Sequence, residues 1–215
     1  MEGGWADKGV QYYCPPGKFG NTSGVQALNE SACFDCYPGY RCPHEGHTTN
    51  TQQSCGASDL FCPAGTAIPK KIRRGYYGVF TKNLIGTETY IPRIGLEAHT
   101  VSGRGSAQTR NYSYDERPCP PGTYCREGLV YDCPAGRFGK REASDDAECD
   151  GPCAAGRYCP DERRTDPYGF ECGDVTKICP LGSSQPQLAR SEGWYTVGGG
   201  DDATRTHEIR CCLLY

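Results

Sequence analysis

Sixteen cysteines are the residues of this chain whose type and spacing could do chemistry. Six of them, from Cys14 to Cys62, form a pattern that recurs between Cys133 and Cys179. Successive intervals are 19, 3, 6, 13 and 7 residues in the first copy and 16, 4, 6, 13 and 7 in the second. The two sets are Cys14, Cys33, Cys36, Cys42, Cys55 and Cys62, and Cys133, Cys149, Cys153, Cys159, Cys172 and Cys179. A cysteine framework repeated with a period near 119 residues indicates an internal duplication.

Disulfide formation is the chemistry that the composition favours. Leu, Ile, Val and Phe total 29 of 215 residues, too few for an ordinary hydrophobic core, and without cysteines such a chain would be expected to be disordered. Six cysteines fall in residues 14–62 and eight in residues 119–179, a density typical of small secreted modules. The even total fits complete pairing, so all sixteen are predicted to form disulfides, including Cys119, Cys125, Cys211 and Cys212.

Equal spacing of the last three intervals predicts that both copies share one disulfide topology. Cys55–Cys62 and Cys172–Cys179 are predicted as local pairs. The other four cysteines of each copy allow three connectivities. Among these we favour the alternating one, in which the first cysteine pairs with the third and the second with the fourth.

Metal binding and redox catalysis are rival uses of these cysteines. Cys33 and Cys36 have the spacing of zinc ligands, and His44 and His47 follow closely. The second copy has neither this spacing nor a nearby histidine, which disfavours a structural zinc site. A redox C-x-x-C motif needs a βαβ setting, which a Gly- and Pro-rich repeat does not provide.

Calcium is a further alternative. Residues 145–151 imitate the start of an EF-hand loop, but the twelfth position of that loop falls on Arg157, which cannot ligate calcium. Asp201 and Asp202 could belong to a looser calcium site. Acidic runs are more often solvated turns, and we predict neither a metal nor any other cofactor.

Enzyme and nucleic-acid functions find no support in the residues. The chain lacks G-x-S-x-G, H-E-x-x-H and a phosphate-binding loop, so we predict that it is not an enzyme. A net charge of −3 gives no field that would select nucleic acid or an anionic membrane. The basic residues of segment 70–74 could form a glycosaminoglycan patch or a processing site, but a solvated loop is favoured.

Tight turns must position the cysteines. Seven glycines stand three residues after a cysteine, often with proline between: Gly17, Gly39, Gly65, Gly122, Gly136, Gly156 and Gly182. Because proline fixes φ and glycine tolerates positive φ, each is predicted to form a tight turn beside a disulfide. Five of these turns are followed by an aromatic ring that we expect to pack against a disulfide: Phe19, Tyr40, Tyr124, Phe138 and Tyr158.

Three domain segments follow from this pattern. Residues 1–13 form an N-terminal arm, residues 14–118 the first cysteine-rich repeat, and residues 119–215 the second. Residues 63–118 contain no cysteine, and their β-branched and aromatic runs at 74–80, 87–91 and 109–114 predict a small antiparallel sheet. The second repeat has a shorter counterpart at 192–197, so residues 81–108 are interpreted as an insertion.

Glycosylation signals agree with the cysteines about the compartment. Asn21, Asn29 and Asn111 begin N-x-[ST] sequons, which can receive glycans only in a secretory pathway. Residues 1–13 carry no signal peptide, and no run of 18 apolar residues could span a bilayer. We therefore expect a processed product, or part of a longer polypeptide, located outside the cell or at its surface.

Three motifs resemble those of the ephrin-receptor-like cysteine-rich repeats. They are C-P-x-G-x-[YF], C-x-x-C-x-x-G-Y-x-C-P at residues 33–43, and G-[WY]-Y-T-V-G-G at 193–199 with T-R-T shortly before a cysteine. The resemblance covers most of residues 14–62 and 119–212. It implies an extracellular, disulfide-bonded, non-enzymatic protein of the kind found in large surface proteins of protists and algae, including flagellar hairs, with relatives in animal receptors. The insertion and the sequence Cys211-Cys212-Leu213-Leu214 depart from the pattern.

The sequence thus predicts a small disulfide-rich, mostly irregular and elongated fold, with short β-hairpins and two tandem repeats. The expected function is a structural segment of a glycosylated surface filament or coat, and the alternative is a ligand-binding receptor ectodomain. Expected partners are N-glycans and either copies of the chain or adjacent domains of a longer polypeptide. Aromatic residues near both ends, such as Trp5 and Trp194, favour head-to-tail contact, which propagates into a filament.

Overall fold

The computed structural model describes residues 3–8, 10–20, 30–49, 53–80, 113–190 and 192–211. Within these ranges the chain contains no α-helix, and its regular structure is ten two-stranded sheets and two 3-10 helices. Seven disulfides cross-link it, which confirms the predicted disulfide-rich, mostly irregular fold with short hairpins. The chain divides into two compact units, Met1–Arg117 with Glu127–Val130, and Pro118–Arg126 with Tyr131–Tyr215.

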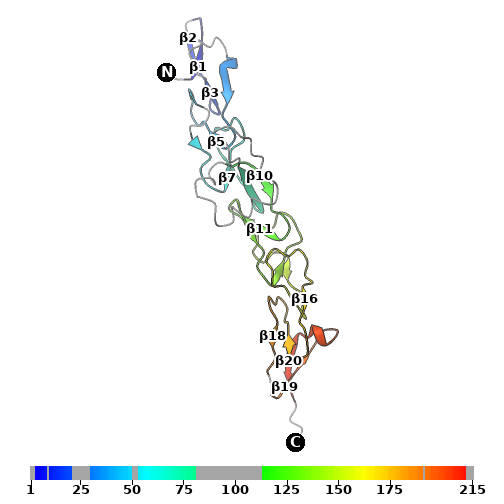
Figure 1. Cartoon of the computed structure of the whole chain (residues 1–215). Coiled ribbons are helices and arrows are strands. Elements are labelled where there is room, and N and C mark those ends of the chain that lie inside the picture. Colours follow the sequence, from blue (N-terminus) through cyan, green and yellow to red (C-terminus); the bar gives the residue numbers. More distant parts are fainter. Residues whose placement is uncertain are drawn as a thin grey trace. The chain divides into compact units, whose positions relative to one another are not determined.

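Within each unit, paired strands follow one another in chain order (Figure 1). The pairs up to residue 118 are β1 (Gly4–Asp7) with β2 (Val10–Tyr13), β3 (Lys18–Gly20) with β4 (Cys33–Asp35), β5 (Tyr40–Arg41) with β6 (Gln53–Ser54), β7 (Leu60–Phe61) with β8 (Lys70–Lys71), and β9 (Tyr76–Phe80) with β10 (Ser113–Pro118). The 3-10 helix η1 (Glu30–Ala32) precedes β4.

The second half of the chain repeats this order. Its pairs are β11 (Thr123–Arg126) with β12 (Leu129–Asp132), β13 (Arg137–Phe138) with β14 (Gly151–Pro152), β15 (Arg157–Tyr158) with β16 (Phe170–Glu171), β17 (Lys177–Ile178) with β18 (Gln187–Leu188), and β19 (Trp194–Val197) with β20 (His207–Arg210). The 3-10 helix η3 (Asp202–Thr204) lies between β19 and β20.

Each C-x-x-G unit folds as a tight turn; five of the turns start a hairpin, and those of Gly65 and Gly182 lie in the loops between β7 and β8 and between β17 and β18. At Gly136 the backbone has φ of 85°, and the N–H of Arg137 donates to the carbonyl of Pro134 at 3.1 Å. A φ near +80° is that of the third residue of a type II turn, a position that glycine occupies without strain. All seven glycines have positive φ, which confirms the predicted turns.

Backbone hydrogen bonds join each turn to the cysteines that follow it. The N–H of Gly136 donates to the carbonyl of Cys159 at 2.8 Å, and its carbonyl accepts from the N–H of Cys153 at 2.9 Å. The N–H of Gly182 then donates to the carbonyl of Cys153 at 2.9 Å. Gly17, Cys42, Cys36 and Gly65 make the same bonds in the first repeat. We call this series of bonds the turn ladder.

The disulfides have one topology in both repeats, as the equal spacing predicted. They pair Cys14 with Cys33, Cys36 with Cys42, Cys55 with Cys62, Cys133 with Cys149, Cys153 with Cys159, and Cys172 with Cys179, and a seventh joins Cys119 to Cys125. The local pairs are confirmed, but the alternating connectivity was wrong. Strands pair with the next strand along the chain, so a cysteine meets the next cysteine along the chain.

Cys211 corrects a second prediction. It is exposed and is the free cysteine among the described residues, so complete pairing of all sixteen cysteines is wrong at this position. Cys212 lies outside the described residues.

The cysteines themselves form the core. All fourteen disulfide-bonded cysteines are between 0% and 8% exposed, and they share the described interior with three aliphatic side chains, Ile72, Val130 and Ile178. The five aromatic rings after the turn glycines are half-buried. Three of them pair with an aromatic ring across their own hairpin: Phe19 with Phe34, Tyr124 with Tyr131 and Tyr158 with Phe170, at centroid distances of 5.9, 5.2 and 5.6 Å. These rings therefore stabilise hairpins on the surface.

A buried hydroxyl follows three of the turn glycines. Thr123 Oγ1 donates to the carbonyl of Pro120 at 2.7 Å, and this side chain is 1% exposed. Thr66 and Ser183 make the same bond in their own turns, at 2.6 and 2.7 Å. A Ser or Thr directly after C-P-x-G is a sequence signal for this bond that the sequence analysis missed.

The hydrogen bonds that close each repeat support an insertion in the first one. Cys62 N–H donates to Ser113 carbonyl at 2.8 Å, and Cys179 N–H donates to Arg205 carbonyl at 2.9 Å. The first bond spans 51 residues and the second 26, so the first repeat is longer at this place. Of the predicted sheet, run 74–80 contains β9, whose partner is β10. Runs 87–91 and 109–112 and segment 81–108 lie outside the described residues.

Gly136→Ala should destabilise the second repeat if the turn ladder holds it together. A non-glycine residue at this φ costs about 1–2 kcal/mol, and its Cβ would also press against the carbonyl of Gly182. Guanidinium unfolding of the disulfide-intact protein, followed by tryptophan fluorescence, measures the loss. Gly200→Ala is the control, because a Cβ there meets nothing within 4 Å; it should shift stability by less than about 0.5 kcal/mol. Equal midpoints for the two variants would contradict the ladder.

Candidate functional site

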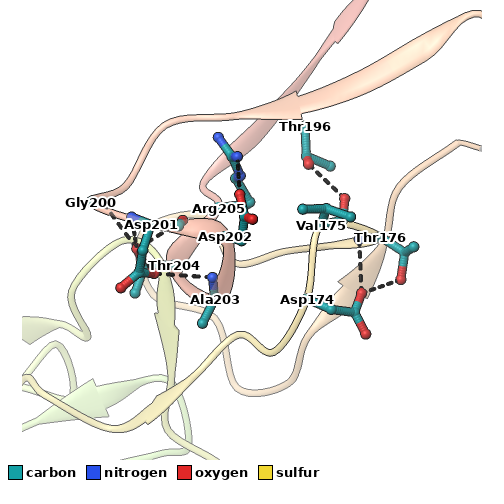
Figure 2. Close-up of polar contacts among 10 residues, drawn as sticks. All are labelled: Asp174, Val175, Thr176, Thr196, Gly200, Asp201, Asp202, Ala203, Thr204 and Arg205. Atoms are coloured by element: carbon teal, nitrogen blue, oxygen red, sulfur yellow. Dashed lines mark hydrogen bonds and ion pairs between the residues drawn. The ribbon is translucent and has the colours of Figure 1, made fainter.

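A cluster of polar contacts in the second repeat lies at the β19–β20 hairpin (Figure 2). One part is the segment around Asp174, within the loop closed by Cys172–Cys179. The other is the segment Gly200–Arg205, between β19 and β20. Thr196 of β19 links the hairpin to the first part, because its Oγ1 donates to the carbonyl of Val175 at 2.6 Å.

Asp201 organises the segment between β19 and β20. It is the N-cap of η3, and its Oδ1 accepts from the N–H of Ala203 at 3.0 Å and from Thr204 Oγ1 at 2.9 Å. Thr204 Oγ1 in turn accepts from the N–H of Asp201 at 3.2 Å, which completes a capping box. Such a box satisfies the orphan N–H groups at the start of a helical turn. The next carboxylate, Asp202, pairs with Arg205.

Asp174 holds a turn of its own. Its Oδ1 accepts from the Thr176 N–H at 2.8 Å and from the Thr176 hydroxyl. These bonds stabilise the ionised carboxylate, and with the charge of Lys177 they hold the pKa of Asp174 below its ordinary value. The carboxylate thus fixes the backbone of this turn.

The cluster closes the end of the second repeat. The carbonyl of Ala203 accepts from the N–H of Gly173 at 3.1 Å, and the carbonyl of Arg205 accepts from the N–H of Cys179. The carbonyl of Thr204 lies directly against Gly156, where a Cβ would not fit. What this arrangement does chemically is to order a loop against the disulfide-bonded turns.

The carboxylate oxygens of the calcium candidates accept hydrogen bonds from nearby donors. Asp201 and Asp202 are engaged as described, and Asp150 binds Arg141 and the backbone N–H of Lys140. Partial burial by itself raises the pKa of Asp150, but the hydrogen bonds from Arg141 and Lys140 outweigh it and hold this pKa below its ordinary value. Across the described part of the chain, no three His, Cys, Asp or Glu side chains are grouped so that they could hold a metal ion.

The cysteines and histidines considered as zinc ligands are engaged in other bonds. Cys33 is joined to Cys14 and Cys36 to Cys42, so neither sulfur is a thiolate. His47 is 9% exposed, and its Nε2 accepts from the N–H of His44 at 3.2 Å. This histidine therefore serves the turn in which it lies.

A cluster of arginine, glutamate and an aromatic ring occurs once in each repeat, and the sequence analysis missed it. The N–H of Arg190 donates to Glu208 Oε2 at 2.8 Å, and its Nε lies 3.1 Å from Oε1. Its guanidinium lies 4.4 Å from the ring centroid of Trp194. Arg73, Glu116 and Tyr76 repeat this arrangement, with a 2.8 Å backbone bond and a 4.0 Å cation–π contact.

This duplicated cluster changes the interpretation of the basic segment 70–74. Arg73 is engaged with Glu116, and Lys71 Nζ lies 3.8 Å from Asp59 Oδ2. The two arginines, Arg73 and Arg190, stand 117 residues apart, the same spacing as between Cys62 and Cys179. An alignment of the two repeats at this spacing places Arg73 on Arg190, and this match is the sequence signal for the duplicated cluster.

The predicted glycosylation sites Asn21, Asn29 and Asn111 lie outside the described residues. No protein-family model and no curated protein sequence matches this chain. In the described ranges, no helix is long and apolar enough to cross a membrane.

Glu208→Gln should weaken the cluster at the end of the second repeat. It keeps the side-chain shape but removes the charge that holds Arg190, whose side chain is 66% exposed. Because water screens the exposed arginine, although the Glu208 side chain is only 17% exposed, we expect a loss of about 0.5–1 kcal/mol. Trp194 emission should change at the same time, since the guanidinium is released from its ring. Glu142→Gln, on an exposed turn, is the control; an equal effect there would contradict the assignment.

Proposed function

We propose that this chain is a non-enzymatic structural module of a glycosylated filament or coat outside the cell. The observation that carries the proposal is the turn ladder, in which each disulfide-closed hairpin is hydrogen-bonded through its backbone to its neighbour. In repeat proteins of this kind, each unit is stabilised mainly by the units next to it. Covalent cross-links add stability by restricting the unfolded chain, and they persist in oxidising environments outside the cell.

Exposed apolar side chains support a function in contact with other molecules. Phe34, Phe170, Leu181 and Leu188 are each more than half exposed. The thin interior has no room to bury them, and contact with a neighbouring molecule in an assembly would cover them. The resemblance to ephrin-receptor-like repeats, some of which occur in surface filaments, points in the same direction.

Glycans provide the first test. The chain secreted by a eukaryotic host should carry N-glycans at one or more of Asn21, Asn29 and Asn111. Amidase treatment should then lower its intact mass and convert each occupied Asn to Asp. Secreted material whose mass does not change would contradict the proposed glycoprotein.

Localisation on source cells provides the second test. Antibodies against the folded chain should label extracellular filaments or a surface coat by immunogold electron microscopy, without permeabilisation. The antigen should remain with insoluble surface material after detergent extraction. Complete release into detergent with membrane proteins would favour the receptor ectodomain instead, and labelling confined to the cell interior would contradict both functions.

A further inference from the structure

Pairs of adjacent basic residues are the signal that one class of endoprotease in the secretory pathway recognises. The chain contains four such pairs, Lys70–Lys71, Arg73–Arg74, Lys140–Arg141 and Arg163–Arg164. An endoprotease must hold several substrate residues in an extended conformation, so it cuts a folded protein where a segment is exposed and can open locally. The structure around each pair therefore decides which of them can be cut.

Three of the pairs lie in backbone that is unsuited to cleavage. Lys70–Lys71 form strand β8, which is paired with β7. The N–H and the Nε of Arg73 bind the carboxylate of Glu116, a side chain that is only 11% exposed. Arg163 has φ of 63°, which is left-handed rather than extended, and the Arg164 side chain is only 18% exposed.

The pair Lys140–Arg141 is on the surface and outside the strands. It lies in the loop between β13, which ends at Phe138, and β14, which begins at Gly151. Both residues of the pair and the following Glu142 are exposed, and 77% of the Arg141 side chain is accessible. An arginine directly before the bond, with a lysine before it, is a sequence that these endoproteases cut well. The structure thus singles out the bond between Arg141 and Glu142.

One carboxylate holds this pair in its folded conformation. Asp150 Oδ2 accepts from the N–H of Lys140 and, at 2.8 Å, from the N–H of Arg141, while Oδ1 accepts from Arg141 Nε. The Asp150 side chain is only 12% exposed, and it directly follows Cys149, which is joined to Cys133. The backbone of the pair is therefore tied to a covalently fixed point, and it can become extended only when these bonds break.

The residues on both sides of the bond hold a neighbouring turn. Before it, the Gly139 carbonyl accepts from the N–H of Gly122 at 2.7 Å. After it, the N–H of Ala143 donates to the carbonyl of Cys119 at 2.8 Å. Ala143 has φ of 56°, so it too must change conformation before an enzyme can bind. The segment 139–143 is thus a strap over the turn that the disulfide Cys119–Cys125 closes.

We propose that the Arg141–Glu142 bond is a processing site for an endoprotease specific for paired basic residues, with Asp150 as the latch that controls its cleavage. The inference rests on the proposed extracellular function, because such enzymes act on chains in the secretory pathway. The reaction is a hydrolysis that consumes one water molecule. The C–N bond breaks, the water oxygen bonds to the carbonyl carbon of Arg141, and the products are a carboxylate on Arg141 and an amine on Glu142.

The cut chain should stay in one piece. The bond lies between Cys133 and Cys149, so their disulfide still joins residues 1–141 to residues 142–215. Cleavage interrupts the strap between Gly139 and Ala143, and the turn beneath it loses a continuous support. Processing would therefore loosen one turn of the module without releasing a fragment.

A purified endoprotease of this class, incubated with the full disulfide-bonded chain, tests the site. The unmodified chain should be cut slowly, giving a new N-terminus at Glu142, one band without reductant and two bands after reduction. Asp150→Ala should be cut about tenfold faster or more, because cleavage follows the population of the opened segment and the variant loses hydrogen bonds to a charged group. Arg141→Gln should abolish this cut.

Asp174→Ala is the matched control, because it removes another carboxylate that holds a turn of the second repeat and bonds to Thr176 instead; it should be cut like the unmodified chain. Peptide mapping should find the native disulfides in both variants. Hydrogen exchange of the unmodified chain gives a measurement that needs no variant, since the amides of Lys140 and Arg141 should exchange slowly.

Faster cleavage at another basic pair, equal rates for Asp150→Ala and Asp174→Ala, or fast exchange of the two amides would each overturn the inference. Immunogold-labelled filaments, together with a chain that stays uncut in both variants, would overturn the processing site alone. The expected cleavage, together with labelling confined to the cell interior, would overturn the filament function alone.

Discussion

A glycine with positive φ, held between disulfide-bonded cysteines, is the constraint on which this structure depends. The glycine reverses the chain and offers its N–H and carbonyl to cysteines further along. Cysteine side chains then fill the interior that aliphatic residues fill in ordinary domains. Because a disulfide is short, the interior is thin, and the hairpins must be stabilised by neighbours along the chain. The composition, which would otherwise favour disorder, is compatible with folding for this reason.

The polar side chains serve the same purpose as the cysteines. Asp201 and Asp174 bind N–H groups or hydroxyls within three residues, and Asp150 binds N–H groups nine and ten residues away. Thr123 donates its hydroxyl to a carbonyl of its own turn. The described strands are short and pair only in twos, so many backbone groups have no regular partner and side chains must satisfy them. Acidic residues that suggest a metal site in the sequence are therefore explained by the local demand for hydrogen-bond acceptors.

The duplication has consequences beyond two similar halves. Equivalent hydrogen bonds join Arg73 to Glu116 and Arg190 to Glu208, and equivalent aromatic stacks cross β1–β2 and β11–β12. Equivalent strands also differ: Val130 of β12 is buried, whereas every residue of β2 is exposed.

The sequence by itself determined the features that depend on residue type and short spacing. Cysteine density indicated a disulfide-rich fold, C-x-x-G indicated the turns, and the seven-residue interval determined Cys55–Cys62 and Cys172–Cys179. Only the tertiary structure decided features that depend on which strands pair across loops of unequal length. These include the pairing of Cys14 with Cys33, the arginine–glutamate clusters and the pairing of β1 with β2 in an N-terminal hairpin. The physical reason is that spacing fixes a local turn, whereas a contact between distant segments depends on the register of every hairpin between them.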